Sequence, residues 1–136
     1  MRAYIDSSVL LRLVLGEPGV LKGWKRVTRP ISSELIRLEC LRTIDRARIQ
    51  FGLADAPVAE RRAAVLERLE AFDLVRVDEA VLERAAEPFP TTLGTLDAIH
   101  LASALLARGR RSELAFATHD AALATAARAV GFRVLG

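Results

Sequence analysis

Residues 2–10 read Arg-Ala-Tyr-Ile-Asp-Ser-Ser-Val-Leu, and they pass from one kind of secondary structure to another at a single acid. Arg2 to Ile5 has the short apolar character of a buried strand, and the apolar residues from Val9 to Val14 recur at helical spacing. Asp6 lies between them, and Asp favours the position just before a helix. We therefore expect a strand, an acid at its C-terminal end, and then a helix.

A stretch near the other end of the chain repeats this layout. Ala115 to Thr118 predicts a strand, Asp120 follows it, and the next helix, Ala121 to Val130, is closed by Gly131. Further strands, separated by helical patterns, are expected at residues 30–32, 74–77 and 132–135. Strands that alternate with helices pair in parallel. The predicted fold class is α/β: a three-layer α/β/α sandwich with a central, mostly parallel sheet of about five strands, formed by residues 1–136 as one domain.

Two further acids fall in predicted helices. Asp97 lies in the first turn of a helix from about Leu96 to Leu106, with Thr95 as its N-cap and Gly109 beyond its end. In open α/β sheets the strand C-termini and helix N-termini line the ligand crevice. Asp97 is therefore expected to converge with the acids that follow the two strands.

Glu39 lies inside a helix of about residues 34–49, which is followed by an expected loop at Gly52 to Pro57. The apolar stripe of this helix consists of Ile36, Cys40, Ile44 and Ala47. Glu39 borders the stripe, so its carboxylate can point along the packed face. Cys40 is predicted to pack in the core, and a single cysteine excludes an internal disulfide and a Cys-based zinc cluster.

Each acid taken alone has an ordinary structural explanation, because Asp caps helices and a helical Glu is usually solvated. The sequences around the acids favour a functional role in addition to capping. The strings are Tyr4-Ile5-Asp6-Ser7-Ser8-Val9-Leu10, Leu38-Glu39-Cys40, Leu96-Asp97-Ala98-Ile99-His100-Leu101-Ala102 and Thr118-His119-Asp120. They embed the acids in apolar sequence, which a surface cap rarely needs.

These four strings resemble those of the PIN-domain nucleases, and most closely the VapC-type toxins of toxin–antitoxin systems. The resemblance covers essentially the whole chain. It implies that Asp6, Glu39, Asp97 and Asp120 are the catalytic residues and hold divalent metal. One departure is Gly94, since members of the family often carry a basic residue shortly before the third acid. That departure concerns a substrate contact, not the metal site.

The resemblance implies a metal-dependent endoribonuclease that acts as the toxin of a toxin–antitoxin pair. Its expected cofactor is Mg²⁺ or Mn²⁺, and its expected partners are an RNA substrate, a cognate antitoxin protein and a second copy of the chain in a homodimer. The chemistry agrees, because clustered carboxylates repel one another and a hard cation relieves that repulsion. Such an ion can also orient a water for in-line attack on phosphorus.

Side chains near the acids carry weaker predictions. Ser7 and Thr118 are either hydrogen-bond partners of the acids or simple caps. His100 is expected to have a packed or hydrogen-bonded role in preference to a ligand role, and His119 is expected to be exposed. Trp24 is expected to anchor a short helix to the core in preference to stacking on a base.

The formal net charge is +3, and apart from Lys22 and Lys25 the basic residues are arginines. Arginine suits phosphate recognition, although an Ala- and Arg-rich composition can also reflect codon usage. Two basic clusters are candidates for contact with a nucleic-acid backbone: Lys22, Lys25, Arg26 and Arg29, and Arg108, Arg110 and Arg111. The apolar runs are too short for a membrane span or signal peptide, so a cytoplasmic protein with no membrane partner is expected.

Three rival functions are left open to different degrees. A phosphoryl-aspartate enzyme or receiver-like domain is disfavoured, because no lysine follows Lys25 and Ser8 stands where a phosphatase would carry a second acid. An RNA-processing PIN nuclease without a toxin role fits the same residues. A PIN-like scaffold that binds RNA or a partner without turnover also fits.

Overall fold

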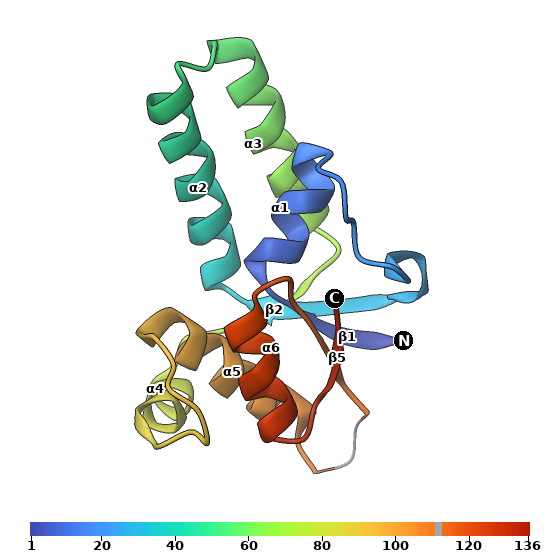
Figure 1. Ribbon diagram of the computed structural model, residues 1–136, viewed down its shortest axis with the longest axis vertical. Coiled ribbons are helices and arrows are strands. Elements are labelled where there is room, and N and C mark those ends of the chain that lie inside the picture. Colours follow the sequence, from blue (N-terminus) through green and yellow to red (C-terminus); the bar gives the residue numbers. More distant parts are fainter. Residues whose placement is uncertain (111–112) are drawn as a thin grey trace.

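A five-stranded sheet forms the centre of the computed structural model, which describes residues 1–110 and 113–136 (Figure 1). The strands are β1 (Arg2–Ile5), β2 (Arg29–Ser33), β3 (Asp73–Val75), β4 (Ala115–Ala117) and β5 (Arg133–Leu135). Every neighbouring pair is parallel, and the strand order is β3-β2-β1-β4-β5. The predicted α/β class, strand number and parallel pairing are confirmed, and strand ends differ from the prediction by one or two residues.

The helices lie on both sides of this sheet, as the sandwich prediction requires (Figure 1). They are α1 (Ser7–Leu15), α2 (Leu35–Phe51), α3 (Asp55–Leu69), α4 (Glu79–Ala86), α5 (Thr95–Arg108) and α6 (Ala121–Ala129), with a short 3₁₀ helix, η1 (Trp24–Arg26). None of the helices in the described ranges combines the length and the apolar character needed to cross a membrane.

Two local predictions are wrong. Pro57 lies in the first turn of α3 and not in a loop, since a proline is tolerated where the backbone N–H would have no intrahelical partner. The N-cap of α5 is Gly94, and Thr95 is the first helical residue. The cap lies one residue earlier because the Gly94 carbonyl already accepts a hydrogen bond from the Ala98 N–H at 2.9 Å.

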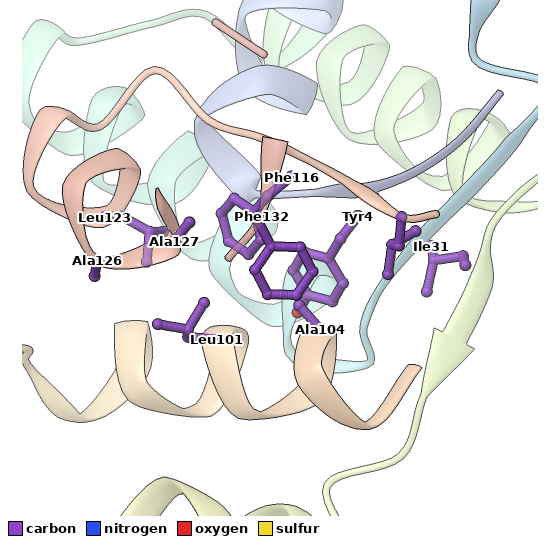
Figure 2. Close-up of a cluster of buried hydrophobic side chains, with 10 residues drawn as sticks. Tyr4, Ile31, Leu101, Ala104, Phe116, Leu123, Ala126, Ala127 and Phe132 are labelled. Atoms are coloured by element: carbon purple, nitrogen blue, oxygen red, sulfur yellow. The ribbon is translucent and has the colours of Figure 1, made fainter. Parts of the chain in front are cut away.

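Strand side chains alternate between two cores. On one face, Tyr4 and Phe116 stack with ring centroids 5.2 Å apart, and they pack with Leu101 of α5 and Leu123 of α6 (Figure 2). On the other face, small and apolar strand residues such as Ala3, Ile5, Ala115 and Ala117 pack against Val9 of α1. The sheet is therefore buried on both sides.

A third cluster joins α1 to the α2–α3 hairpin. Cys40 is fully buried there with Ile36 and Ile44, which confirms the predicted stripe and the packing role of the cysteine. Ala47, the last member of the predicted stripe, is half-buried. α2 and α3 run side by side away from the sheet (Figure 1).

The order of the strands determines where a site can form. From β1 the chain proceeds outward to β2 and β3 on one side, and then returns to place β4 and β5 on the other. The gap between the carboxyl ends of β1 and β4 is the topological switch point, where ligands of open α/β sheets bind. The segments that follow these two strands carry Asp6 and Asp120.

Candidate active site

Asp6 is held at the carboxyl edge of the sheet by both its backbone and its side chain. Its N–H donates to the Ala117 carbonyl of β4 at 3.0 Å, and the residue is 5% exposed. Its Oδ2 accepts hydrogen bonds from Ser8 Oγ at 2.7 Å and Thr118 Oγ1 at 3.0 Å. Within the described part of the chain, the hydrogen bonds to this carboxylate all fall on Oδ2, and Oδ1 is left for another ligand.

Two hydroxyls connect Asp6 to the segment after β4. Thr118 Oγ1 accepts from the Asp120 N–H and Ser8 Oγ accepts from the His119 N–H, each at 3.0 Å. Of the two roles left open for Thr118, the structure shows the hydrogen bond to Asp6. Ser8 was not predicted in this role, although a hydroxyl two residues after a helix-capping Asp was a usable signal.

Glu39 is reached through a chain of buried hydrogen bonds that begins on β2. The Ser33 N–H donates to the Tyr4 hydroxyl oxygen at 2.9 Å, and that hydroxyl lies 2.7 Å from His100 Nδ1. His100 Nε2 in turn hydrogen-bonds Glu39 Oε1. Tyr4, Ser33 and His100 are all 0% exposed, so the chain is closed to water.

The Ser33 N–H, the donor at the start of this series of hydrogen bonds, indicates the direction of the bonds that follow. The Tyr4 oxygen already accepts the Ser33 N–H, so its own hydrogen is available for His100 Nδ1. His100 Nε2 is then the nitrogen that donates its hydrogen to Glu39. Burial lowers the pKa of His100, but the hydrogen bond and the charge of Glu39 outweigh it and raise that pKa overall. The predicted hydrogen-bonded role of His100 is confirmed.

Ser7 approaches Glu39 from the side of α1. Its Oγ donates to Glu39 Oε2 at 3.5 Å, a long hydrogen bond beside the short one to Oε1. The side chain of Glu39 is 18% exposed, so it lies at the border between the packed face and solvent, as its position beside the apolar stripe predicts.

Asp97 and Asp120 complete the set from two helix N-termini. Asp97 lies in the first turn of α5 and is half-buried, and Asp120 is exposed and caps α6 through its Oδ1, which accepts from the Leu123 N–H at 2.8 Å. Burial raises the pKa of Asp97, the charges of Asp120, Asp6 and Glu39 raise it further, and His100 opposes them. The four predicted acids therefore act on one another electrostatically.

The carboxylates fit a hard divalent cation in chemistry, but their side chains are not gathered around one point. Among the described residues, no three carboxylates, thiols or imidazoles lie close enough to hold an ion together. Magnesium and manganese prefer oxygen ligands, and the mutual repulsion that raises the pKa of Asp97 is what a cation would relieve. The residues suited to hold such an ion, after side-chain movement, are Asp6, Glu39, Asp97 and Asp120.

His119 follows β4 at this edge, whereas Trp24 lies near the amino ends of β1 and β2. The prediction that His119 is exposed is wrong: the residue is half-buried, and burial followed by the charge of Arg12 lowers its pKa. Trp24 lies in η1, 6.5 Å from the ring of Phe72, and packs on the core beside α1, which confirms the anchoring role.

The two predicted basic clusters differ in their surroundings. Lys22, Lys25, Arg26 and Arg29 are exposed. In the other cluster, Arg108 stacks over the ring of Phe132 at 4.3 Å and donates to the Val130 carbonyl at 3.3 Å, so it is part of the packing. Arg111 lies outside the described residues.

Comparison with known proteins agrees with this architecture. The model of the PIN domain family matches residues 3–129. Ribonuclease VapC46 of Mycobacterium tuberculosis (strain ATCC 25618 / H37Rv) is 36% identical, over 97% of this chain and 95% of that protein. Ribonuclease VapC47 of M. tuberculosis (strain CDC 1551 / Oshkosh) is 35% identical over 95% and 92%, and Ribonuclease VapC35 of the same strain is 33% identical over 97% and 94%. The chain therefore belongs to the PIN-domain family and is of the VapC type.

Proposed function

We propose that this protein is a divalent-metal-dependent endoribonuclease that hydrolyses RNA phosphodiester bonds and serves as the toxin of a toxin–antitoxin pair. The observation that supports the proposal is that four acids from four separate segments lie near enough to interact: burial raises the pKa of Asp97, and the charges of Asp120, Asp6 and Glu39 raise it further. The ribonuclease names of the full-length relatives support the choice of RNA as substrate.

Different residues would have different roles in such a reaction. Bound Mg²⁺ or Mn²⁺ supplies the positive charge that activates a water and stabilises the leaving oxygen. Asp6 is held rigidly by the hydroxyls of Ser8 and Thr118, so it is the best oriented of the proposed ligands. Glu39 is oriented by the N–H of His100 and acts either as a ligand or as the base that accepts a proton from the water. The hydrogen bonds that orient Asp6 and Glu39 lower the cost of organising the reaction.

The test is cleavage of total cellular RNA by the purified protein with Mg²⁺, with Mn²⁺ or with EDTA. Asp6→Asn removes the charge and keeps the shape and capping ability of the side chain, so folding should survive. Asp73→Asn is the matched control, because Asp73 is an exposed acid on the edge strand β3, paired with Arg29. We expect discrete, metal-dependent products from the wild type and the control and none from Asp6→Asn. Intact RNA in every lane would refute the nuclease.

The toxin role has its own test. Expression of the wild type should arrest growth of a bacterial host, and Asp6→Asn should not. Co-expression with a cognate antitoxin should restore growth and yield a stable complex, and light scattering of the free protein should give the mass of a homodimer. Metal-dependent cleavage without growth arrest would favour an RNA-processing PIN nuclease, and RNA binding without cleavage would favour a scaffold. A cytoplasmic location is part of the proposal, because cellular RNA and the antitoxin are expected there.

A further inference from the structure

A basic cavity that His119, the residue before Asp120, helps to line is not used by the proposed metal chemistry. It has a volume of about 490 Å³ and lies between α1, the loop that follows it, and the segments after β4 and β5. Its lining residues are Arg12, Gly19, Val20, Leu21, Lys22, His119, Val134, Leu135 and Gly136. The ionisable side chains among these described residues are all basic, so the cavity favours an anion.

Arg12 connects the cavity to the active-site acids. It follows Ser8 by four residues on α1, so the two side chains lie on the same face of the helix, and Ser8 Oγ hydrogen-bonds Asp6. Within the described residues, the one hydrogen-bond partner of its guanidinium is the Gly19 carbonyl, at 3.5 Å from Nη1. Most of its five N–H donors are therefore available to a ligand.

Gly19 makes this position of Arg12 possible. The glycine has φ +86°, and a Cβ atom there would lie 2.9 Å from Arg12 Nη1. A larger residue would be strained in this backbone conformation and would displace the guanidinium. The loop after α1 therefore fits closely around the arginine at the wall of the cavity.

His119 offers a second, independent sign of a missing partner. Its Nε2 is buried, and among the described residues it has no hydrogen-bond partner. Buried polar nitrogens normally have one, and His119 as a residue lines the cavity, so this nitrogen is available to a ligand once the ring turns toward the cavity. The backbone of His119 is fixed by its hydrogen bond to Ser8 Oγ, and the next residue is Asp120, so the ring is held at the border between the cavity and the acids.

We propose that Arg12, Lys22 and His119 bind a backbone phosphate of the RNA strand, next to the phosphodiester that the four acids address. This inference rests on the proposed function, and it assigns the position of the substrate strand beside the acids. Arginine and lysine together suit a phosphate, because the planar fork of Arg binds two phosphate oxygens and Lys adds a point charge. The cavity thus holds the strand from the side of α1 while the acids act on the neighbouring linkage.

The test is equilibrium binding of a fluorescein-labelled, single-stranded oligoribonucleotide, measured by anisotropy over a series of NaCl concentrations with Mg²⁺ present. Asp6→Asn serves as the parent, because it should bind without cutting. Arg12→Gln and Lys22→Gln are introduced into the parent singly and together. Arg62→Gln is the matched control, since Arg62 is exposed on α3, away from the cavity.

We expect Arg12→Gln to weaken binding several-fold and to lower the slope of log K against log salt by about 0.7, the value for one lost phosphate contact on a single strand. The double variant should lose more, and Arg62→Gln should match the parent. Arg12→Lys should recover part of the affinity, which separates a charge contact from a folding defect. Thermal melting of each variant checks that it is folded.

The outcomes separate this inference from the proposed nuclease. If the wild type cleaves RNA and Arg12→Gln binds with the affinity and slope of the parent, the phosphate site is wrong and the nuclease stands. If the expected change in slope is found but the wild type cuts no RNA, the phosphate site stands and the nuclease falls. If the parent binds no oligoribonucleotide, the phosphate site falls, and the cleavage assay on the wild type alone decides the nuclease.

Discussion

Removal of the Tyr4 hydroxyl gives the sharpest test of the buried hydrogen-bond chain that leads to Glu39. Tyr4→Phe keeps the ring that stacks on Phe116, so the apolar packing is preserved. It leaves two fully buried groups without a partner, the Ser33 N–H and His100 Nδ1. Each unsatisfied buried group costs about 1–3 kcal/mol, so we expect the free energy of unfolding to fall by about 2–6 kcal/mol.

The measurement is urea denaturation followed by circular dichroism. With an m-value of about 2 kcal/mol/M, the expected loss moves the unfolding midpoint down by about 1–3 M urea. The variant should still fold, because single domains have about 5–15 kcal/mol of stability. Thr125→Val is the control, since the Thr125 hydroxyl is exposed and bonds only within its own helix, to the Ala121 carbonyl at 3.0 Å.

The control should change stability by no more than about 0.5 kcal/mol. A loss equally small in Tyr4→Phe would refute the reasoning, because it would mean that the hydroxyl is not the shared partner of Ser33 and His100. If Tyr4→Phe loses the expected amount of stability but cleaves RNA with unchanged kinetics, the buried hydrogen bonds support the fold and do not affect Glu39.

Four further predictions concern the site and the core. His100→Leu removes the N–H that orients Glu39, so single-turnover cleavage should slow by about 10- to 100-fold, and His100→Gln, which retains an N–H donor, should recover part of the rate. Asp97→Asn should leave the metal-free protein at least as stable as the wild type at neutral pH, measured by urea denaturation in EDTA. The raised pKa means that the stability contributed by Asp97 is present below its ordinary pKa and is lost as pH rises through the raised one. MgCl₂ should raise the Tm of the wild type above an NaCl control of equal ionic strength, and Asp6→Asn should lose this effect. Burial raises the pKa of Cys40 to about 12, so a thiol reagent at neutral pH should label the protein only after it unfolds.

Each of these predictions can fail separately. Equal rates for His100→Leu and the wild type would exclude a positioning role for His100. A clear destabilisation by Asp97→Asn at neutral pH would mean that Asp97 is a stabilising cap and not a repelled carboxylate. A Tm that responds to MgCl₂ equally in Asp6→Asn would place the ion elsewhere, and rapid labelling of native Cys40 would show that α2 opens readily.

Much of the fold follows from local pattern alone. The strands, the helices that separate them and the parallel pairing were predictable, because apolar periodicity records which side of each element is buried. The elements that carry the four acids were also predictable, since Asp6 and Asp120 follow strand ends, Asp97 begins a helix and Glu39 lies within one. Where the prediction failed, at Pro57 and Thr95, the difference was in the exact turn at which a helix begins, which propensity determines poorly.

The contacts that orient the acids were decided by the tertiary structure. His100 meets Glu39 across 61 residues and Tyr4 across 96, and Thr118 meets Asp6 across 112. The sequence showed that His100 lies on a packed helix face, but its partner depends on which strand lies opposite that face. The strand order, in which β1 lies beside β4, decides which strand faces the helix. The periodicity of one segment does not indicate which other segment packs against it. The sequence alone thus determined which acids are present and on which elements they lie, and only the packing of those elements decided which side chains hold them in place.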